Sequence, residues 1–278
     1  MTVAAVERCL SILTTLAGER DPMELTDIAV RNGLPASAVH RILTTLATHG
    51  WVTQDPDTQR YALSLRMSTL AFRNLDARAV PEMVQSVLDA LAQRTREYCR
   101  LAIVEGDDLV WVARAQGATS SLRYEPPMGQ EIILHATANG KAWLATLPEE
   151  QALELVRERG FDVKRALGPN SVSSMKELKV ALEETRALGY ATSIEEAEAG
   201  TMALAVPFHS GLGPNARVAG TISVAGPLVR LTPDRHEELA GQLHEAAREI
   251  GGIWPLRNRQ RDHFPSGSAL DELRGKGA

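Results

Sequence analysis

The residues best suited to chemistry lie on one face of a predicted helix between Pro35 and His49. Hydroxyl, imidazole and guanidinium groups recur there at helical spacing, opposite the apolar positions: Ser37, Ala38, His40, Arg41, Thr44 and Thr45. Such groups hydrogen-bond to phosphate oxygens and to the edges of bases. The interval 28–54 contains no aspartate or glutamate, so its surface does not repel a polyanion. These residues predict contact with nucleic acid.

Three helices and a hairpin are predicted to carry this face. The first helix is expected to bury an apolar stripe formed by Val3, Val6, Leu10, Leu13 and Leu16. A short second helix begins with Thr26 as its N-cap and stops at Asn32-Gly33, and the polar face follows on the third. Two short strands at 51–53 and 60–63 flank the turn sequence DPDT. This order is typical of a winged helix-turn-helix, which places one helix in the major groove of DNA.

Roles within this domain follow from reach and charge. Arg41 and His40 are predicted to reach base edges, whereas Arg31 and Arg60 are predicted to contact phosphates. The full predicted DNA-contacting set is Thr26, Arg31, Ser37, Ala38, His40, Arg41, Thr44, Thr45, Gln59 and Arg60. The alternative is the solvated face of an ordinary helical bundle, and the absence of lysine from the first 66 residues favours it. The wing and the acid-free interval favour DNA binding.

Composition limits the class of protein. The chain has 278 residues, a formal net charge of -5 and an apolar fraction of 44%, which fits two globular domains. Any nucleic-acid contact must therefore be local. Cys9 and Cys99 are too few for a disulfide framework or a metal cluster. With neither an apolar span nor a signal-peptide core, a cytoplasmic location is expected.

The second half of the chain alternates strands with helices. Strands are expected at 98–106, 108–116, 201–209 and 216–226. Helices are expected at 139–147, at 148–159, after Ser174, and from Thr232 to Ile250. Short hairpin connections leave no room for parallel crossovers, so the fold class is α+β with a mainly antiparallel sheet. The predicted limits are 1–64 for the winged domain, 65–80 for a linker helix, 81–255 for the second domain and 256–278 for a disordered tail.

The second domain carries no G-x-S-x-G, H-E-x-x-H, paired-cysteine or glycine-rich phosphate motif, so no catalytic activity, metal or cofactor is expected. A predicted helix start at Ala138, Asn139 and Gly140 offers free backbone N–H groups to a carboxylate, with Lys141 in water. His135 borders this helix start, although a structural role is the better interpretation. The acidic residues Glu195, Glu196 and Glu198 are expected to be solvated.

Five sequence blocks closely resemble the IclR family of bacterial transcriptional regulators, in order and in spacing. They are ERCLSILTTLA, LTDIAVRNGLPASAVHRILTTLATHGWV, ILHATANGKAWLA, LEETRALGYATSIEE and VAGTISVAGP, and the match runs from about Thr2 to Pro255. The resemblance implies a winged DNA-binding domain, a linker helix and a C-terminal GAF-like α/β effector domain. It also implies dimers or dimers of dimers, with the winged domain making much of the dimer contact.

The resemblance also implies where an effector binds. By position, the family's ligand pocket falls on Tyr124, Ile132, Ala138, Asn139, Ser193, Thr201, Ala203, Ser223 and Ala225. His135 and Gly140 complete the predicted effector-binding set. Members that bind small oxoacids place an acid, a thiol and two serines where this chain has Ser193, Ala203, Ser223 and Ala225. This loss of polarity predicts a larger ligand, an aromatic or branched organic acid, with its carboxylate on the helix start.

The sequence therefore predicts a homo-oligomeric transcriptional regulator that binds double-stranded operator DNA under the control of a small organic-acid effector. The alternative is a metabolite-binding enzyme or sensor whose N-terminal domain serves only in dimerisation. A protein-interaction adaptor is a third interpretation. Repression versus activation, and dimer versus tetramer, stay open at this point.

Overall fold

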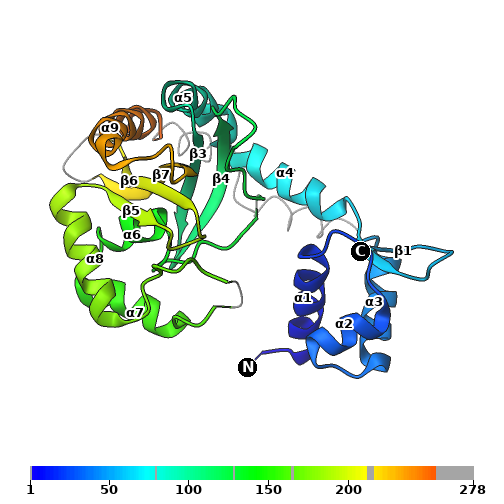
Figure 1. Ribbon diagram of the computed structural model, residues 1–278. Coiled ribbons are helices and arrows are strands. Elements are labelled where there is room, and N and C mark those ends of the chain that lie inside the picture. The colour runs from blue at the N-terminus through cyan, green and yellow to red at the C-terminus, as the bar shows by residue number, and fades with distance from the viewer. Residues whose placement is uncertain (1, 79, 128, 164–165, 212–215, 255–278) are drawn as a thin grey trace, which may run out of the picture. The chain divides into compact units, whose positions relative to one another are not determined.

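In the computed structural model, the described residues are 2–78, 80–127, 129–163, 166–211 and 216–254 (Figure 1). Packing divides the chain into two compact units, Met1–Ala77 and Arg78–Ala278. Each unit has its own apolar core. The tail predicted at 256–278 lies outside the described residues.

The first unit is a winged helix-turn-helix followed by a helix. Its elements are α1 (Ala4–Ala17), α2 (Leu25–Asn32), α3 (Ala36–Thr48), β1 (Val52–Gln54), β2 (Tyr61–Leu63) and α4 (Arg66–Arg78). Gly33 ends α2 with φ of 61°, a left-handed conformation that favours glycine. Thr26 is not the N-cap of α2, because the helix already starts at Leu25 and Glu24 takes that place. The antiparallel pair β1 and β2 forms the wing.

The buried face of α1 differs from the predicted one. Ile12 and Leu16 are buried against α2, α3 and the wing strands, whereas Val3, Val6 and Leu10 are exposed. The apolar residues of this helix cover more of its circumference than one core contact can bury. Leu13 and Leu16 of the predicted stripe pack on the core beside Ile12, whereas the N-terminal part of the stripe does not. An apolar surface therefore remains on α1 in the described structure.

The second unit is an α/β domain built on a five-stranded antiparallel sheet. Its strands are β3 (Tyr98–Glu105), β4 (Asp108–Gln116), β5 (Ala191–Ile194), β6 (Thr201–Ser210) and β7 (Arg217–Pro227), in the order β4-β3-β7-β6-β5. Its helices are α5 (Val80–Thr95), α6 (Ala138–Leu144), α7 (Glu149–Arg159), α8 (Met175–Leu188) and α9 (His236–Ile253), with the short 3-10 turn η1 (Pro233–Arg235) before α9. The predicted fold class is confirmed. The edge strand β5 was missed, because four residues give too short an alternation to recognise.

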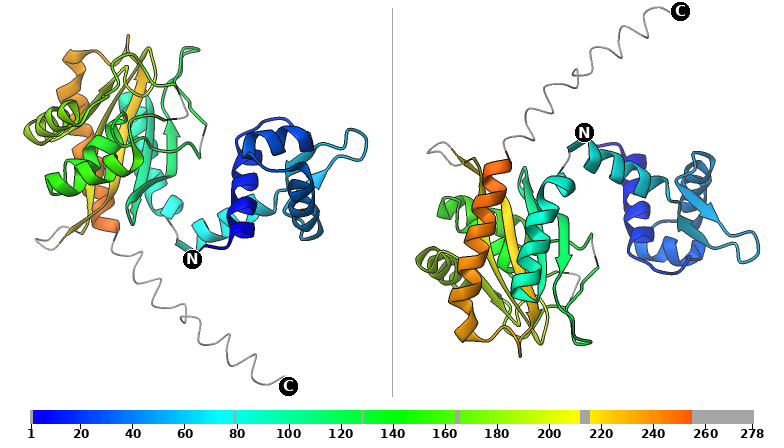
Figure 2. Two further views of the ribbon diagram at one scale, coloured as in Figure 1. Left: turned by 90° about the horizontal axis from the view of Figure 1, so that it is seen from below. Right: turned by 90° about the horizontal axis from the view of Figure 1, so that it is seen from above.

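Helices cover both faces of the sheet. Helices α5 and α9 lie side by side on one face, and α6, α7 and α8 lie on the other (Figures 1 and 2). Alternate residues of β3 serve the two layers: Cys99 and Leu101 point to α5 and α9, whereas Tyr98 and Arg100 point to the α6 side. Burial raises the pKa of the Cys99 thiol to about 12, so this cysteine stays protonated in the core.

Small side chains let α6 lie close to the sheet. Ala138 and Ala142 of α6 pack directly on Ala191 and Ala205 of the strands. At Gly140 the helix also approaches the preceding turn, and a Cβ atom there would lie 2.3 Å from the carbonyl oxygen of Leu134. No side chain larger than hydrogen fits at this position without a shift of the backbone.

Gly140→Ala is therefore expected to destabilise the protein by about 1–3 kcal/mol, because the methyl group meets backbone rather than a flexible side chain. Gly241→Ala is the matched control, since Gly241 lies in α9 with nothing within 4 Å of its added Cβ. That change is expected to stabilise by up to about 1 kcal/mol through helix propensity. Urea unfolding measures both, and equal stabilities would contradict the close approach of α6.

Candidate DNA-binding and effector sites

Helix α3 presents the polar face that its sequence predicts. Val39, Leu43 and Leu46 are buried in the core of the first unit, whereas His40 and Arg41 are exposed. The remaining predicted residues lie on the same outer side, with Ser37, Thr44 and Thr45 exposed and Ala38 half-buried. The core contacts fix the helix, and its cationic and hydroxyl groups remain at the surface.

The two threonine hydroxyls on α3 are already used as donors. Thr44 Oγ1 donates to the His40 carbonyl at 2.8 Å, and Thr45 Oγ1 donates to the Arg41 carbonyl at 3.0 Å. In this arrangement the hydroxyl oxygens can accept hydrogen bonds from base amino groups, but they do not donate to phosphate. Among the helix residues, Arg41 and His40 offer the charged or ionisable donors.

The two predicted phosphate-contacting arginines are paired with acids that flank the acid-free interval. Arg31 forms an ion pair with Glu19, and Arg60 Nη2 lies 2.9 Å from Glu24 Oε1. All four side chains are at least one-third exposed, and such surface pairs contribute only about 0–1 kcal/mol. Phosphate oxygens can therefore replace the glutamates at little cost.

The wing turn uses its polar side chains internally. Gln59 has φ of 59°, its Nε2 donates to the Pro56 carbonyl at 2.8 Å, and its Oε1 accepts from Gln54 at 3.0 Å. Asp55 accepts hydrogen bonds from the backbone and hydroxyl of Thr58, which lower the pKa of its carboxyl. Gln59 is therefore a residue that shapes the wing, and Thr26 stands exposed in the first turn of α2.

Sequence reasoning missed Arg66, the first residue of α4. Its Nη1 donates to the carbonyl of His49 at 2.8 Å, and its guanidinium lies 5.3 Å from the centroid of the Trp51 ring. The Ser64 hydroxyl also donates to the Gly50 carbonyl. These contacts satisfy carbonyls at the end of α3 and join it to the start of α4. No sequence signal indicated this role, because Arg66 lies in the predicted linker.

A small cavity lies between α6 and the α6-facing side of the sheet. It has a volume of about 30 Å³ and is lined by Arg100, Tyr124, Thr137, Ala138, Asn139, Ser193, Ala197, Thr201, Met202, Ala203, Ser223 and Ala225. Eight of the predicted effector-binding residues are in this lining. They come from α6, β5, β6, β7 and the segment that carries Tyr124, so the tertiary fold brings distant parts of the chain together.

Three predicted effector-binding residues do not line the cavity. Ile132 is buried in the neighbouring core beside α7 and α8. His135 is buried against Phe161, 4.9 Å between ring centroids, and burial lowers the pKa of its imidazole. Gly140 has no side chain, and its N–H donates to the Thr137 hydroxyl at 3.1 Å. The helix start is therefore capped by its own residue rather than offering all of its N–H groups to a carboxylate.

Arg100 is the main residue that sequence reasoning missed in this cavity. It lies on β3 directly opposite Ser223 of β7, and its guanidinium lies 3.8 Å from the centroid of the Trp111 ring. Arg100 thus gives the lining a polar group that Ala203 and Ala225 do not supply. An arginine within an otherwise apolar strand was a signal, because charged residues are seldom buried without a partner or a function.

The cavity is small for the predicted ligand. A cavity that holds benzene has a volume of about 150 Å³, whereas this one has about 30 Å³. An aromatic acid therefore does not fit unless lining side chains move. A larger ligand was expected because this chain has fewer polar side chains at the pocket positions than family members that bind small oxoacids. That reasoning did not include the volume that Arg100 and Tyr124 fill.

Lys141 and Glu196 form a buried ion pair beside the cavity. Lys141 Nζ lies 2.6 Å from both carboxylate oxygens of Glu196, which joins α6 to the segment between β5 and β6. Both residues were expected in water, but each is more than nine-tenths buried. Burial raises the pKa of the Glu196 carboxyl, and the ammonium opposes this rise. The pair fixes the segment that carries Ala197.

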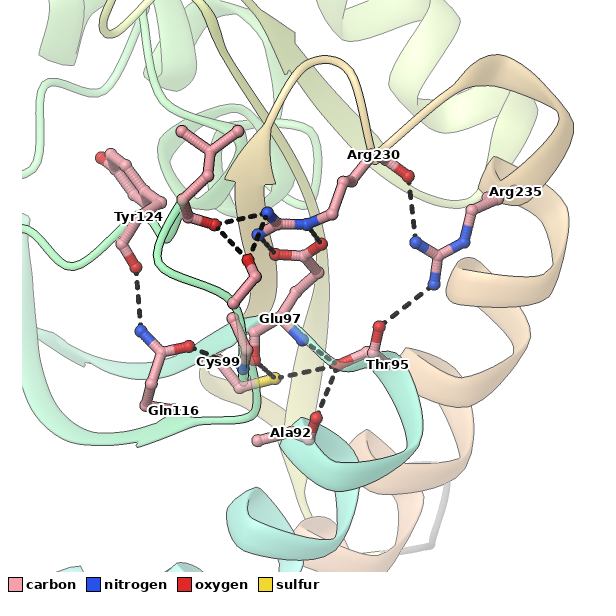
Figure 3. A network of polar contacts seen from close by, with 11 residues as sticks. Ala92, Thr95, Glu97, Cys99, Gln116, Tyr124, Arg230 and Arg235 are labelled. Atoms are coloured by element: carbon pink, nitrogen blue, oxygen red, sulfur yellow. Dashed lines mark hydrogen bonds and ion pairs between the residues drawn. The ribbon is translucent and has the colours of Figure 1, made fainter.

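A second network holds the segment that carries Tyr124 (Figure 3). Glu97 is 1% exposed, and its two oxygens accept from Arg230 Nε at 2.5 Å and Nη2 at 2.7 Å. Arg230 also donates to the carbonyl of Leu122. Gln116 Nε2 donates to the Tyr124 carbonyl at 3.1 Å. The backbone of this segment is therefore anchored on the sheet, which places the Tyr124 ring at the cavity.

Two family models match the chain along most of its length. Residues 5–56 match the IclR helix-turn-helix domain, and residues 72–251 match the bacterial transcriptional regulator IclR C-terminal domain. The chain belongs to the IclR family. It is 30% identical to the transcriptional repressor IclR of Escherichia coli over 89% of each chain. It is 31% identical to the HTH-type transcriptional regulator KdgR of Dickeya chrysanthemi, over 90% of this chain and 79% of the relative.

Solved structures of other proteins share this fold. An IclR transcriptional regulator from Alicyclobacillus acidocaldarius matches with a TM-score of 0.75 and 26% identity, over 92% of this chain and all of the other. HmgR of Pseudomonas aeruginosa matches with a TM-score of 0.64 and 27% identity, over 90% and 98% of the two chains. This IclR protein is a DNA-binding transcriptional regulator with a C-terminal effector-binding domain. Among its described residues, no helix is long and apolar enough to span a membrane.

Lys141→Met is expected to destabilise the protein by about 3–5 kcal/mol, because it leaves the Glu196 carboxylate buried without its cation. Without the ammonium, the pKa of Glu196 rises further, so stability falls as pH increases through that raised pKa. Lys179→Met is the matched control, since the Lys179–Glu149 pair is exposed and contributes little. Urea unfolding on both sides of neutral pH separates the two variants. Equal losses would contradict the buried pair.

Proposed function

We propose that this protein is a homo-oligomeric regulator whose binding to double-stranded operator DNA is controlled by a small organic acid held in the cavity beneath α6. The observation that carries the proposal is the cavity itself. Residues from β3, β5, β6, β7, the start of α6 and two connecting segments meet there, and the lining includes a guanidinium, an amide and several hydroxyl groups beside apolar side chains. Ligand sites commonly combine an apolar lining with a few such polar groups.

The DNA-binding proposal assigns α3 to the major groove and the wing to the backbone. Arg41 and His40 reach base edges, the Ser37 hydroxyl accepts or donates at the same surface, and the Thr44 and Thr45 hydroxyls accept there. The small side chain of Ala38 allows α3 to approach the DNA closely. Thr26, Gln59, Arg31 and Arg60 lie at the phosphate-facing margin, with the two arginines exchanging glutamate for phosphate.

Exposed apolar side chains support assembly with a second copy of the chain. Val3, Val6 and Leu10 of α1 and Leu70 and Phe72 of α4 are each more than half exposed. Surfaces of this kind on a DNA-binding unit suit a homodimer, or a dimer of dimers. Two units bound to neighbouring half-sites gain affinity that one unit with so few cations lacks.

Effector control is proposed to pass through the linker helix α4. Arg66 joins the start of α4 to the end of α3, so a change in α4 alters the presentation of the recognition helix. A ligand changes operator affinity only as far as it binds the two arrangements differently, and such coupling is about 1–3 kcal/mol. The proposed roles are DNA binding for 1–64, coupling for 65–80 and effector binding for 81–255.

The names of the relatives support repression rather than catalysis, and we propose that this regulator acts in the cytoplasm. Two of them are named transcriptional repressor IclR and acetate operon repressor, and they cover most of this chain. By this analogy the effector changes the occupancy of an operator and is not consumed. Mixing the protein with its own upstream DNA at several salt concentrations, then adding organic acids, tests the proposal. Turnover of an acid without salt-sensitive DNA binding would favour the enzyme alternative.

Arg41→Ala is expected to weaken operator binding by about 1–3 kcal/mol and to relax the preference at one base pair. Arg60→Ala is expected to weaken all sequences alike and to lower the salt dependence, because phosphate contacts carry no sequence information. Arg248→Ala, on the exposed side of α9, is the control with no expected change. Gel shifts with operator variants measure all three, and an unchanged Arg41→Ala variant would remove the base-reading role.

Ala203→Leu is expected to fill the cavity and abolish the response to the effector while leaving operator affinity intact, since Ala203 lies in the second unit and lines the cavity. Ala199→Leu is the matched control, because Ala199 is exposed in the nearby segment and does not line the cavity. Fluorescence anisotropy of labelled operator, with and without an active acid, measures the response. A normal response in the Ala203→Leu variant would place the effector site elsewhere.

A further inference from the structure

We infer that Arg8 of α1 binds a phosphate of the DNA backbone, which enters a groove between α1 and α3. This inference adds helix α1 to the DNA-binding surface, whereas the predicted DNA contacts lie on α2, α3 and the wing. It rests on the proposed placement of α3 in the major groove. Four features of the described residues support it.

The first feature is the groove itself, which has a volume of about 390 Å³. Helix α1 lines it with Ala5, Arg8 and Cys9, and α3 lines it with Ala38, Arg41, Ile42, Thr45 and Leu46. A cavity of about 150 Å³ holds benzene, so this groove has room for a group much larger than a bound water. Ala38, Arg41 and Thr45 already belong to the predicted DNA-contacting set. The groove therefore borders the face of α3 that is proposed to meet DNA.

The second feature is the charge of the groove. Its described lining holds two guanidinium groups, those of Arg8 and Arg41, and no carboxylate. Residues 1–64 hold only five arginines and no lysine against seven acidic residues, so two cations in one groove are a local exception. The field of such a groove favours an anion. A phosphate suits it, because a guanidinium donates paired hydrogen bonds to phosphate oxygens.

The third feature is that the Arg8 guanidinium has no other partner in the part of the chain that the structure describes. Arg31 is paired with Glu19 and Arg60 with Glu24, whereas Arg8 is exposed and forms no ion pair or hydrogen bond through its side chain there. Phosphate binding by Arg8 therefore breaks no contact within the protein. Arg31 and Arg60 must each exchange a glutamate first.

The fourth feature is the position of Arg8 on α1. The face of α1 that buries Ile12 and Leu16 in the core continues one turn earlier with Arg8 and Cys9, because residues three and four apart share a helix face. The core contact therefore fixes the side of α1 on which Arg8 lies. Phosphates border the major groove, so a cation beside a helix in that groove meets the backbone rather than the base edges.

This use of α1 is compatible with the proposed pairing of two copies. The exposed apolar residues Val6 and Leu10 are one turn apart and share a helix face with each other, whereas Arg8 lies between them in sequence and on another side of the helix. A contact between two copies through the apolar side therefore leaves the groove open to DNA.

Substitution of Arg8 in the full chain tests the phosphate contact. Arg8→Gln is expected to weaken binding to the protein's own upstream DNA and to an unrelated duplex by the same factor, about threefold or more at low salt. The slope of log affinity against log salt concentration is expected to fall in magnitude by about 0.9 for each copy of the chain bound. Arg8→Lys keeps the charge and is expected to retain most of this slope. Fluorescence anisotropy of labelled DNA at several salt concentrations measures both quantities.

Arg20→Gln is the matched control, because Arg20 is exposed in the connection between α1 and α2 and does not line the groove. It removes the same charge from the same unit and is expected to leave the salt slope unchanged. Equal losses in the two glutamine variants would assign the effect to net charge and overturn the inference. Unchanged affinity and slope in the Arg8→Gln variant would overturn it as well.

Protection of Cys9 tests the groove without any substitution. Cys9 is a half-buried free thiol in the groove, whereas Cys99 is buried in the core of the second unit, where burial raises its pKa to about 12. We expect N-ethylmaleimide to alkylate Cys9, and most of this alkylation to be lost at saturating upstream DNA. Cys99 is the internal control, because it reacts only if the protein unfolds.

Three outcomes of the alkylation experiment would overturn the inference. The first is an unchanged rate of Cys9 alkylation at saturating DNA. The second is equal protection by inorganic phosphate at the same ionic strength, which would assign the groove to a free anion. The third is a Cys9 thiol that is unreactive before DNA is added, which would mean that another surface, such as a second copy of the chain, already covers the groove.

The same DNA-binding measurements separate this inference from the proposed function. If Arg8→Gln weakens binding but organic acids leave operator affinity unchanged, the inference stands and effector control fails. If organic acids alter operator affinity but the wild-type and Arg8→Gln proteins bind DNA alike, effector control stands and the inference is overturned. If Arg8→Gln weakens binding and Arg41→Ala does not, the phosphate contact stands and the base-reading role of Arg41 fails.

Discussion

The close packing of α6 on the sheet is the constraint on which the second unit depends. Alanines on both surfaces and glycine at position 140 bring the helix near the strands. The same small side chains leave a hollow beside the helix, which Arg100 and Tyr124 partly fill. The close approach also buries Lys141, whose charge is then balanced by Glu196 from the segment after β5. The close packing of α6 on the sheet thus creates the cavity and determines which buried charges must be paired around it.

The polar groups around this cavity differ in whether another group of the protein already uses their hydrogen-bond donors. Thr137 caps the start of α6 and occupies the N–H of Gly140, so the helix start is partly satisfied by the protein itself. The strand side offers a stacked guanidinium and a hydroxyl without a partner. A buried hydroxyl without a partner costs free energy, and a ligand that bonds to it recovers that free energy. More of the polar side chains that line the cavity therefore come from the sheet than from the helix.

The DNA-binding unit is not basic overall, since residues 1–64 hold five arginines, no lysine and seven acidic residues, and three arginines of the unit are already engaged. Arg31 and Arg60 are balanced by glutamates just outside the acid-free interval, and Arg66 is used to join α3 to α4. Little net charge is left to attract DNA without sequence preference. Such a unit gains useful affinity by acting in pairs, which makes the arrangement of two copies a natural point of control.

The sequence by itself determined the order of the elements apart from β5, because helix periodicity, the DPDT turn and the glycine stops are local signals. It also predicted the polar face of α3, and the family resemblance located eight residues that prove to share one cavity. Only the tertiary structure decided that Arg100 joins them, that Ile132 and His135 do not, and that Lys141 and Glu196 meet in the core. On α1, Val6 and Leu10 of the predicted stripe likewise stay exposed, whereas Leu16 is buried and Leu13 packs on the core. The local sequence shows which residues are polar or apolar. What each residue contacts is decided by the pairing of β3 with β7 and by how closely α6 packs on the sheet.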